Sequence, residues 1–256
     1  MDLEICGLCA AYGKRERIHN ISFSVKKGEF LALIGRNGSG KSTLVSCIGG
    51  VLPYTGEIKT NGVSFLEMNR RERARTVAIL PQVITAPHIT VEELVSFGRN
   101  PYLKIGESFS EKDRTIVESA LADAMLLSLR KRYVNTLSGG ERRRAYLGMI
   151  LAQDTPIIVL DEATANMDMA VEGGFWELIS RLCREKGKTV LAVMHNIGDA
   201  VRLSDKIVLL DSGNLLYFGD TKTLLLGTLL EETLSVKRYL AEENGEKRIF
   251  FAPKTR

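Results

Sequence analysis

Apolar and polar residues alternate near the amino terminus of the chain. Ile21, Phe23 and Val25 are separated by single polar residues, a period of two that is typical of a strand with one buried face. Turns are expected at Gly13 and at Gly28, because glycine is favoured where the backbone reverses. Residues 3–34 are therefore predicted to be rich in β-strand.

Three later runs are apolar at every position, namely residues 30–34, 157–160 and 190–194. Continuous apolar runs of this length are typical of strands covered on both faces, as in a parallel sheet. Between the last two runs, the apolar spacing within residues 175–182 predicts a helix. Strands and helices that alternate in this way indicate an α/β fold.

Glycine-containing turns separate several further segments of the chain. The elements predicted from these signals are a helix at 41–49, a hairpin at 55–65, a strand at 75–80, a hairpin of 206–211 with 215–218, a helix at 224–234, and a terminal hairpin of 236–241 with 247–252.

Residues 84–152 differ in character, since they show no convincing strand pattern. Thr90 and Glu93 have the spacing of a capping box, which predicts that a helix starts there. Ser110 and Asp113 open a second helix, which is predicted to run to Leu127. We interpret this region as a helical insertion between the strands.

The composition is that of a globular protein of one or two domains. Of 256 residues, 45% are hydrophobic and 26% are charged, and the net charge is +4. The arginine clusters at 70–75, 130–132 and 142–144 are interpreted as solvated faces. No run of about 18 apolar residues occurs and the amino terminus lacks a signal-peptide pattern, so a cytosolic protein with reduced cysteines is expected.

The first apolar run leads directly into a glycine-rich turn that ends in Lys41 and Ser42. Residues 35–42 read G-x-x-x-x-G-K-S, the spacing of a phosphate-binding P-loop. The glycines let backbone N–H groups approach phosphate oxygens, and the following helix points its positive end at the same place. Lys41 would approach the β- and γ-phosphates and Ser42 would hold Mg²⁺. The alternative, a plain strand-to-helix turn, does not explain why all these residues occur in this order.

Two carboxylates, Asp161 and Glu162, follow the second apolar run. Such a pair means little by itself. In a chain with a P-loop, the first can hold the Mg²⁺ coordination shell and the second can orient or deprotonate the attacking water.

Residues 137–141 read Leu-Ser-Gly-Gly-Glu. Ser138 and Glu141 alone would make an ordinary capping box. Two glycines in a first helical turn cost about 1 kcal/mol each relative to alanine, and a cap does not need them. We therefore favour a second phosphate contact at this helix N-terminus.

The P-loop, Gln82, residues 137–141, the Asp161 and Glu162 pair and His195 together resemble the ATP-binding cassette (ABC) family in order and spacing. The resemblance implies an α/β fold: a P-loop NTPase (RecA-like) core with a mixed sheet, an antiparallel β subdomain and an inserted α-helical subdomain. The expected boundaries are 1–83 and 153–230 for the core with its β subdomain, 84–152 for the helical signature subdomain, and 231–256 for the C-terminal helix end and a small β-hairpin.

The same resemblance implies ATP hydrolysis with Mg²⁺, and it assigns roles to individual residues. Catalysis would involve Lys41, Gln82, Glu162 and His195, and Mg²⁺ would be held near Ser42, Gln82 and Asp161. Nucleotide contacts would come from Tyr12, Gly35, Arg36, Asn37, Gly38, Ser39, Gly40, Lys41, Ser42, Thr43, Gln82, Ser138, Gly139, Gly140, Glu141 and Asp168.

Two of these assignments have plain alternatives. Tyr12 would stack on adenine, but it could be a surface tyrosine of a strand. His195 would contact the γ-phosphate, but it also reads as a polar residue at a strand end. The sequence departs from the usual family pattern at Glu141, at Met167 and at Asn196, and none of these changes removes a catalytic group.

The family resemblance also implies partners. Residues 138–140 would complete the ATP site of a second copy, so that two ATP molecules lie between two head-to-tail subunits with C₂ symmetry. Because the sequence has no membrane span, a transporter would need separate membrane subunits, expected to dock near residues 82–102, and indirectly a substrate-binding protein. The cassette would then be peripheral on the inner face of the cell membrane.

Residues 98–102, Gly-Arg-Asn-Pro-Tyr, are similar to a segment of iron-siderophore, haem and cobalamin importers. The simpler reading is a helix that ends at Pro101. Two hypotheses remain: the ATPase subunit of such an importer, or a soluble cassette that serves cofactor assembly or acts with nucleic acid. The second would usually need an added interaction segment or a dominant basic stripe, and neither is evident, so no nucleic-acid partner is expected.

Overall fold

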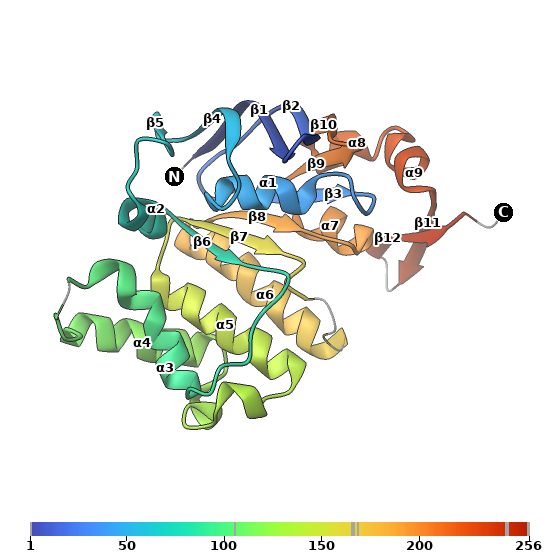
Figure 1. Cartoon of the computed structure of the whole chain (residues 1–256). Coiled ribbons are helices and arrows are strands. Elements are labelled where there is room, and N and C mark those ends of the chain that lie inside the picture. Colours follow the sequence, from blue (N-terminus) through green and yellow to red (C-terminus); the bar gives the residue numbers. More distant parts are fainter. Residues whose placement is uncertain (1, 105, 165–166, 168, 244–245, 255–256) are drawn as a thin grey trace.

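A six-stranded mixed sheet forms the centre of the molecule (Figure 1). The computed structural model describes the chain except residues 1, 105, 165–166, 168, 244–245 and 255–256. The strand order is β10-β9-β3-β8-β7-β6, and all neighbours are parallel except β9 and β10. The strands are β3 (Phe30–Gly35), β6 (Val77–Leu80), β7 (Ile157–Asp161), β8 (Thr189–Val193), β9 (Lys206–Asp211) and β10 (Asn214–Asp220).

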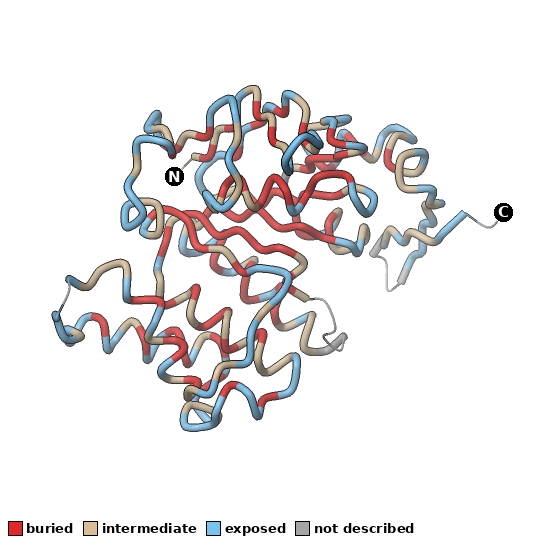
Figure 2. Tube along the Cα trace, viewed as in Figure 1, coloured by how far each residue is buried: buried red, intermediate tan, exposed pale blue. Residues whose placement is uncertain are grey.

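Both faces of this sheet are buried, which is why its strands are apolar at consecutive positions (Figure 2). In β3, Phe30, Ala32 and Ile34 face a core shared with the long helix α6 (Met169–Lys186). Leu31 and Leu33 point the other way, toward α1 (Lys41–Ile48). Full burial of each large apolar side chain contributes about 1.5–3 kcal/mol, so the sheet is held firmly from both sides.

A smaller antiparallel sheet covers the far side of α1 (Figure 1). Its strand order is β2-β1-β4-β5. The strands are β1 (Leu3–Tyr12), β2 (Arg15–Val25), β4 (Tyr54–Thr60) and β5 (Val63–Ser64). The predicted β-rich amino terminus and the hairpin around Asn61 are confirmed.

Residues 84–152 form a group of helices with its own apolar core. The helices are α3 (Val91–Ser96), the 3₁₀ helix η1 (Phe97–Tyr102), α4 (Glu111–Asp123), the 3₁₀ turns η2 (Leu127–Leu129) and η3 (Val134–Thr136), and α5 (Gly139–Gln153). Thr90, Ser110 and Ser138 each cap a helix through a full capping box, as their spacing predicts.

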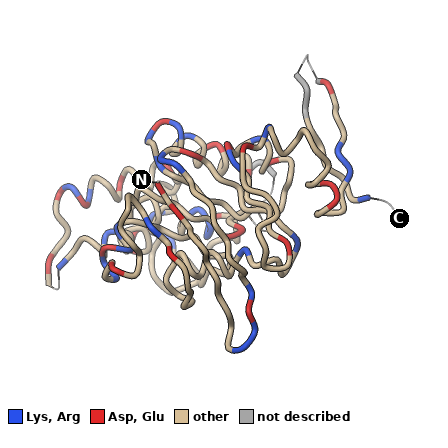
Figure 3. Tube along the Cα trace, turned by 90° about the horizontal axis from the view of Figure 1, so that it is seen from above, with Lys and Arg blue, Asp and Glu red and all other residues tan. Residues whose placement is uncertain are grey.

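The carboxyl-terminal part adds three short helices and a two-stranded ribbon. These are α7 (Ile197–Leu203), α8 (Thr221–Leu224), α9 (Leu229–Leu234), β11 (Val236–Glu243) and β12 (Glu246–Pro253). The predicted terminal hairpin is present, although its expected turn at residues 244 and 245 lies outside the described residues. Seen from above, the ribbon extends from the body, and basic and acidic residues are interspersed along the chain (Figure 3).

Three predicted element boundaries are wrong. The strand expected at 75–80 begins only at Val77, because Asn69 and Glu72 form a capping box that starts helix α2 (Arg70–Thr76). The second helix of the insertion ends at Asp123 instead of Leu127, since Met125 has a left-handed backbone with φ of 54°. The helix expected at 224–234 is two helices separated by residues 225–228, which include the helix breaker Gly227.

Two other findings bear on the sequence analysis. Cys6, Cys9, Cys47 and Cys183 form no disulfide in the part of the chain that the structure describes. Within the described part of the chain, no helix combines the length and the apolar character that crossing a membrane requires.

Candidate functional site

The P-loop connects β3 to α1 through a turn that only glycine fits. A Cβ atom on Gly35, whose φ is 155°, would lie 2.3 Å from the carbonyl oxygen of Leu210. Gly40 has a φ of 104° and caps α1 without any side-chain hydrogen bond. The first N–H groups of α1 are therefore left for an external acceptor, as an anion-binding helix terminus requires.

Lys41 is buried at the start of α1, and its ammonium group bends back over the P-loop. Its Nζ donates to the carbonyl oxygens of Gly35 at 2.9 Å and Arg36 at 3.0 Å. Burial lowers the pKa of Lys41, and the nearby carboxylates of Glu162 and Asp161 oppose that shift. The positive charge is thus held between the phosphate-binding loop and the two acids.

Ser42 and Asp161 meet from different elements. The Ser42 hydroxyl donates to Asp161 Oδ1 at 3.4 Å. Asp161 is buried at the end of β7, and burial raises the pKa of its carboxyl group, Glu162 adds to the rise, and the Ser42 hydrogen bond opposes it. A hydroxyl and a buried carboxylate side by side are hard oxygen ligands, which fit Mg²⁺.

Glu162 is at the centre of a three-residue cluster. Gln82 Nε2 donates to its Oε2 at 2.5 Å, and His195 Nε2 lies 2.6 Å from its Oε1. The three side chains follow the neighbouring parallel strands β6, β7 and β8, whose carboxyl ends form one edge of the sheet. Glu162 also has a left-handed backbone, with φ of 50°, which is unusual for a residue other than glycine and occurs often at functional sites.

Lys41, Ser42, Gln82, Glu162 and His195 line one pocket of about 450 Å³, whereas Asp161 lines a different pocket. A volume of this size is in the range of small-molecule sites. Its walls come from five separate segments of the chain: Tyr12, Arg17, Asn37, Gly38, Gly40, Lys41, Ser42, Thr43, Gln82, Glu162 and His195. Tyr12 is 52% exposed at its edge, so its ring is free to stack on a ligand.

Comparison with known proteins decides what kind of protein has this pocket. The ABC transporter family matches residues 18–165. The petrobactin import ATP-binding protein FpuC of Bacillus anthracis is 35% identical over 246 residues, which cover 95% of this chain and 90% of FpuC. The chain belongs to the ABC transporter family.

Two further relatives cover most of the chain. The iron(3+)-hydroxamate import ATP-binding protein FhuC of Bacillus subtilis is 33% identical, over 88% of this chain and 84% of its own length. The ferric enterobactin transport ATP-binding protein FepC of Escherichia coli is 34% identical, over 92% of this chain and 88% of its own length.

Solved ABC structures share the fold. An inward-facing putative metal-chelate type transporter superposes with a TM-score of 0.86 and 25% identity, covering 99% of this chain and 97% of that one. The MJ0796 cassette with ADP and phosphate, a dimer, superposes with a TM-score of 0.76 and 25% identity, covering 86% of this chain and 98% of that one. The predicted P-loop NTPase fold class is confirmed, and the chain is an ATPase of the ABC family.

The ABC signature, residues 138–141, is not among the residues that line the nucleotide pocket of the same chain. Ser138 and Gly139 are exposed at the start of α5, and a Cβ on Gly139 would meet no atom within 4 Å. Packing within the chain therefore gives no reason for this glycine. Of the other predicted contacts, Gly35, Arg36 and Ser39 do not line the pocket, and Asp168 lies outside the described residues.

Two arginines at the site were not predicted from the sequence. Arg17 lines the pocket beside Tyr12. Arg143 belongs to a cluster interpreted as a solvated face, but it is buried, and its Nη2 donates to the carbonyl oxygen of Gln82 at 3.0 Å. Burial lowers the pKa of Arg143, and Glu162 opposes the shift. The burial of Arg143 was not predicted because it lies in a run of three arginines, and periodicity does not distinguish a buried arginine from a solvated one.

Proposed function

We propose that this chain is the ATP-hydrolysing subunit of an importer for an iron chelate, attached to membrane subunits at the inner face of the cell membrane. The observation that supports the cargo is the agreement among relatives: FpuC, FhuC and FepC are named for petrobactin, iron(3+)-hydroxamate and ferric enterobactin. The metal-chelate type transporter structure matches nearly the whole chain. We therefore favour a siderophore over haem or cobalamin.

Substrate binding follows from the pocket. Adenine would stack on Tyr12, and the phosphates would lie at the P-loop. There the N–H groups of α1 and the Lys41 ammonium would donate hydrogen bonds to the phosphate oxygens and stabilise their negative charge. Ser42, Gln82 and Asp161 would hold Mg²⁺, which neutralises charge on the β- and γ-phosphates when it is bound.

Hydrolysis would depend on the cluster around Glu162. Its carboxylate would orient the attacking water and take its proton, while Gln82 and His195 keep the carboxylate in place through the close contacts described above. His195 would also contact the γ-phosphate. Residues 138–141 would close the site of a second copy of the chain in a head-to-tail pair.

The cargo is tested in the organism that encodes the chain. Cells with Lys41→Ala in place of the parent chain should lose uptake of radioactive iron given as a siderophore complex, because the charge-assisted contact to ATP is worth about 1.5–3 kcal/mol. Lys26→Ala, which removes an exposed lysine remote from the pocket, is the control. If Lys41→Ala cells lost cobalamin or haem uptake and kept siderophore uptake, the cargo proposal would be wrong. Intact uptake of all three would favour a cassette without a transport role.

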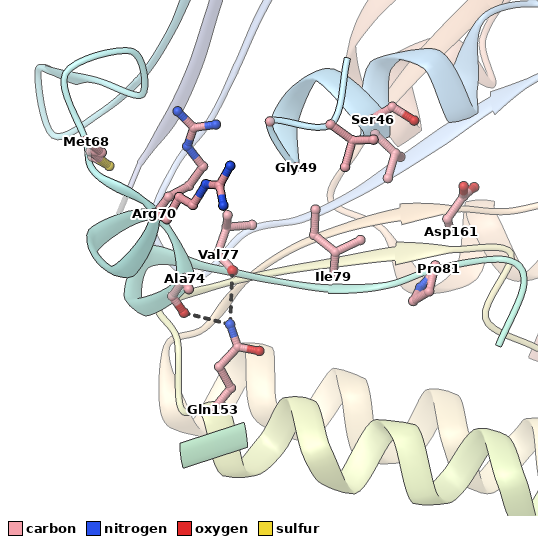
Figure 4. A pocket seen from close by; sticks show the side chains of 14 residues that line it. Ser46, Gly49, Met68, Arg70, Ala74, Val77, Ile79, Pro81, Gln153 and Asp161 are labelled. Carbon is pink, nitrogen blue, oxygen red and sulfur yellow. Dashed lines mark hydrogen bonds between the residues drawn. The ribbon is translucent and has the colours of Figure 1, made fainter. Parts of the chain in front are cut away.

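A second pocket, of about 750 Å³, is proposed as the docking site of the membrane subunit (Figure 4). It is bounded by the end of α1, by α2 and β6, and by the last residues of α5 and of β7, Gln153 and Asp161. Apolar residues form much of the wall: Val45, Val51, Met68, Val77, Ile79 and Pro81. Val51 is 82% exposed, and Val83, just beyond Pro81, is 80% exposed, so apolar surface continues at the rim.

A short helix from the membrane subunit is the occupant that fits this pocket. An apolar groove of this kind takes the apolar face of an amphipathic helix. Arg70 and Arg73 at one wall favour an occupant with an acidic side chain or a helix C-terminus facing them, since both are negative. The pocket adjoins the region expected from the sequence, residues 82–102, through Val83 at its rim. Arg99 of that region is only 4% exposed, so it is not proposed as a contact.

Crosslinking tests this docking site. A cysteine at Val51 should crosslink to the membrane subunit in isolated membranes, whereas a cysteine at Val63, exposed on β5 outside the pocket, should not. The parent chain, treated in the same way, measures any background crosslinking through its exposed Cys6. Equal crosslinking from positions 51 and 63 would mean that the pocket is not the docking site.

A further inference from the structure

Residues 98–102 cap the carboxyl-terminal end of α5. The last carbonyls of a helix lack partners within it. Arg99 Nη1 donates to the carbonyl oxygen of Ala152 at 2.9 Å, and the Tyr102 hydroxyl donates to that of Gln153 at 2.9 Å. A cation and a hydroxyl group from η1 thus satisfy the end of a helix that begins at the ABC signature.

This cap is rigid. Arg99 Nε pairs with Asp113 Oδ1 at 2.9 Å, and both residues are buried. The Arg99 guanidinium lies 4.0 Å from the centre of the Tyr102 ring, and that of Arg75 lies 5.0 Å from it. A buried ion pair is costly to break, so η1, α4 and the end of α5 move as one unit.

Gln153 connects this unit to the proposed docking pocket. Its Nε2 donates to the carbonyl oxygen of Ala74 at 2.6 Å and to that of Val77 at 3.3 Å, at the junction of α2 and β6 (Figure 4). Ala74, Val77 and Gln153 all line the pocket. An occupant therefore touches both ends of these hydrogen bonds.

The other end of α5 lies at the signature. The helix has 15 residues and so spans about 22 Å. Ser138 caps it, and Arg143, just over one turn inside, bonds the Gln82 carbonyl oxygen. Because a helix of this length transmits a displacement at one end to the other, the position of Gln153 bears directly on that of residues 138–141.

We infer that Gln153 is a positioning residue that couples the occupant of the docking pocket to the placement of the signature. Its two hydrogen bonds fix α5 to the junction of α2 and β6, and an occupant that shifts this junction shifts α5 with it. The inference rests on the proposed function, since it takes the membrane subunit as the occupant. Gln153 is not among the residues that line the nucleotide pocket, and its side chain donates to Ala74 and Val77, so it acts through α5.

The test uses the complex of the tagged full-length chain with the membrane subunit that co-purifies with it from its own cell membranes. Gln153→Met keeps the length of the side chain and removes both donated hydrogen bonds. Ser46→Ala is the matched control: Ser46 lines the same pocket, but its hydroxyl bonds only the Ser42 carbonyl oxygen within α1. Tyr102→Phe is a second variant that removes one capping bond and keeps the ring. Basal ATPase rate, KM for ATP, melting temperature and the rate within the complex are measured for each.

With Gln153→Met, stimulation of the ATPase rate by the membrane subunit should fall about 5-fold or more, the lower bound of typical coupling between sites. The basal rate, KM and co-purification should not change, and Ser46→Ala should behave like the parent chain. Tyr102→Phe should lower stimulation in the same direction. The inference is overturned if Gln153→Met is stimulated like the parent chain, or if basal and stimulated rates fall together, which would indicate a purely structural role. Failure of any membrane protein to co-purify with the parent chain would overturn the proposed function itself.

Discussion

Three ionisable side chains near the P-loop affect one another's charge. Lys41, Asp161 and Glu162 lie within electrostatic reach, and burial works against the charged forms of Lys41 and Asp161. The two carboxylates favour the charged form of Lys41, whereas Glu162 disfavours the charged form of Asp161. The electrostatic energy of such a site becomes more favourable when a triphosphate and a divalent cation add charges of both signs. This is the electrostatic basis of nucleotide binding here.

The buried carboxyl group of Asp161 makes stability depend on pH. Its pKa is raised in the folded chain, so protons bind the folded state more tightly than the unfolded one. The favourable contribution is present below the ordinary pKa of aspartate and is lost as pH rises through the raised value. Asp161→Asn removes the buried charge and should raise the melting temperature at neutral pH, without Mg²⁺ or nucleotide.

Melting temperatures of the parent chain and Asp161→Asn from about pH 8 to about pH 3 test this prediction, since the interval includes the ordinary pKa of about 3.9 and extends above it. The difference between the two proteins should shrink toward the acidic end. A difference that stays constant, or grows as pH falls, would contradict the assignment of a raised pKa to Asp161. Asp220→Asn is the control, because Asp220 is exposed and its side chain makes no capping hydrogen bond to α8.

At the scale of elements, η1 and α5 approach so closely that Gly98 has no room for a side chain. A Cβ there would lie 2.2 Å from the carbonyl oxygen of Met149 and 2.8 Å from the backbone nitrogen of Gln153. Both are backbone atoms of α5, so neither can move aside alone. Close packing therefore requires glycine at position 98. The close approach brings Arg99 and Tyr102 within reach of the end of α5.

Gly98→Ala should destabilise the chain by about 1–3 kcal/mol, the usual cost of overpacking a filled interior. Gly173→Ala in α6 is the control, because a Cβ there would meet no atom within 4 Å and alanine favours a helix. Urea unfolding of both variants measures the difference. If Gly98→Ala were as stable as the parent, the close approach of η1 to α5 would be wrong.

The sequence predicts those elements whose chemistry is local. The P-loop and the acids after β7 are recognisable because phosphate and Mg²⁺ restrict which residues serve within a few positions. Helix α2 was missed although Asn69 and Glu72 signal its start, because the following arginines have no apolar period. Arg143 and Gln153 could not be predicted, since their roles depend on elements far apart in the chain that only packing brings together.

At the scale of the whole molecule, one chain holds two incomplete surfaces. The nucleotide pocket contains the P-loop and the cluster around Glu162, whereas the signature at Ser138 faces solvent at another place on the surface. The MJ0796 cassette, a relative in fold, forms a dimer with ADP and phosphate. We propose the same pairing here, because it would bring Ser138 of one chain to the pocket of the other.

Glu162→Gln separates binding from hydrolysis in this pair. Glutamine keeps the shape and loses the base, so hydrolysis should slow by about 10²–10⁴-fold. Lys41, Ser42 and the P-loop backbone remain, so ATP should still bind. ATP would then persist between two chains, and the variant should dimerise with ATP and stay monomeric with ADP in size-exclusion chromatography.

Ser138→Arg added to Glu162→Gln tests whether the signature takes part in the dimer. The new side chain projects from an exposed helix start, so its bulk enters the partner's pocket. It also removes the Ser138 cap of α5, a loss of about 0.5–2 kcal/mol that the melting temperature of the monomer reports. The double variant should be monomeric with ATP at protein concentrations where Glu162→Gln is dimeric. Cassettes can pair weakly, so both proteins are compared over a wide range of concentrations. A double variant that dimerises as readily as Glu162→Gln would contradict this role and leave residues 137–141 as a helix cap only. If position 138 contacts the γ-phosphate bound to the partner, no space is left there for an arginine side chain.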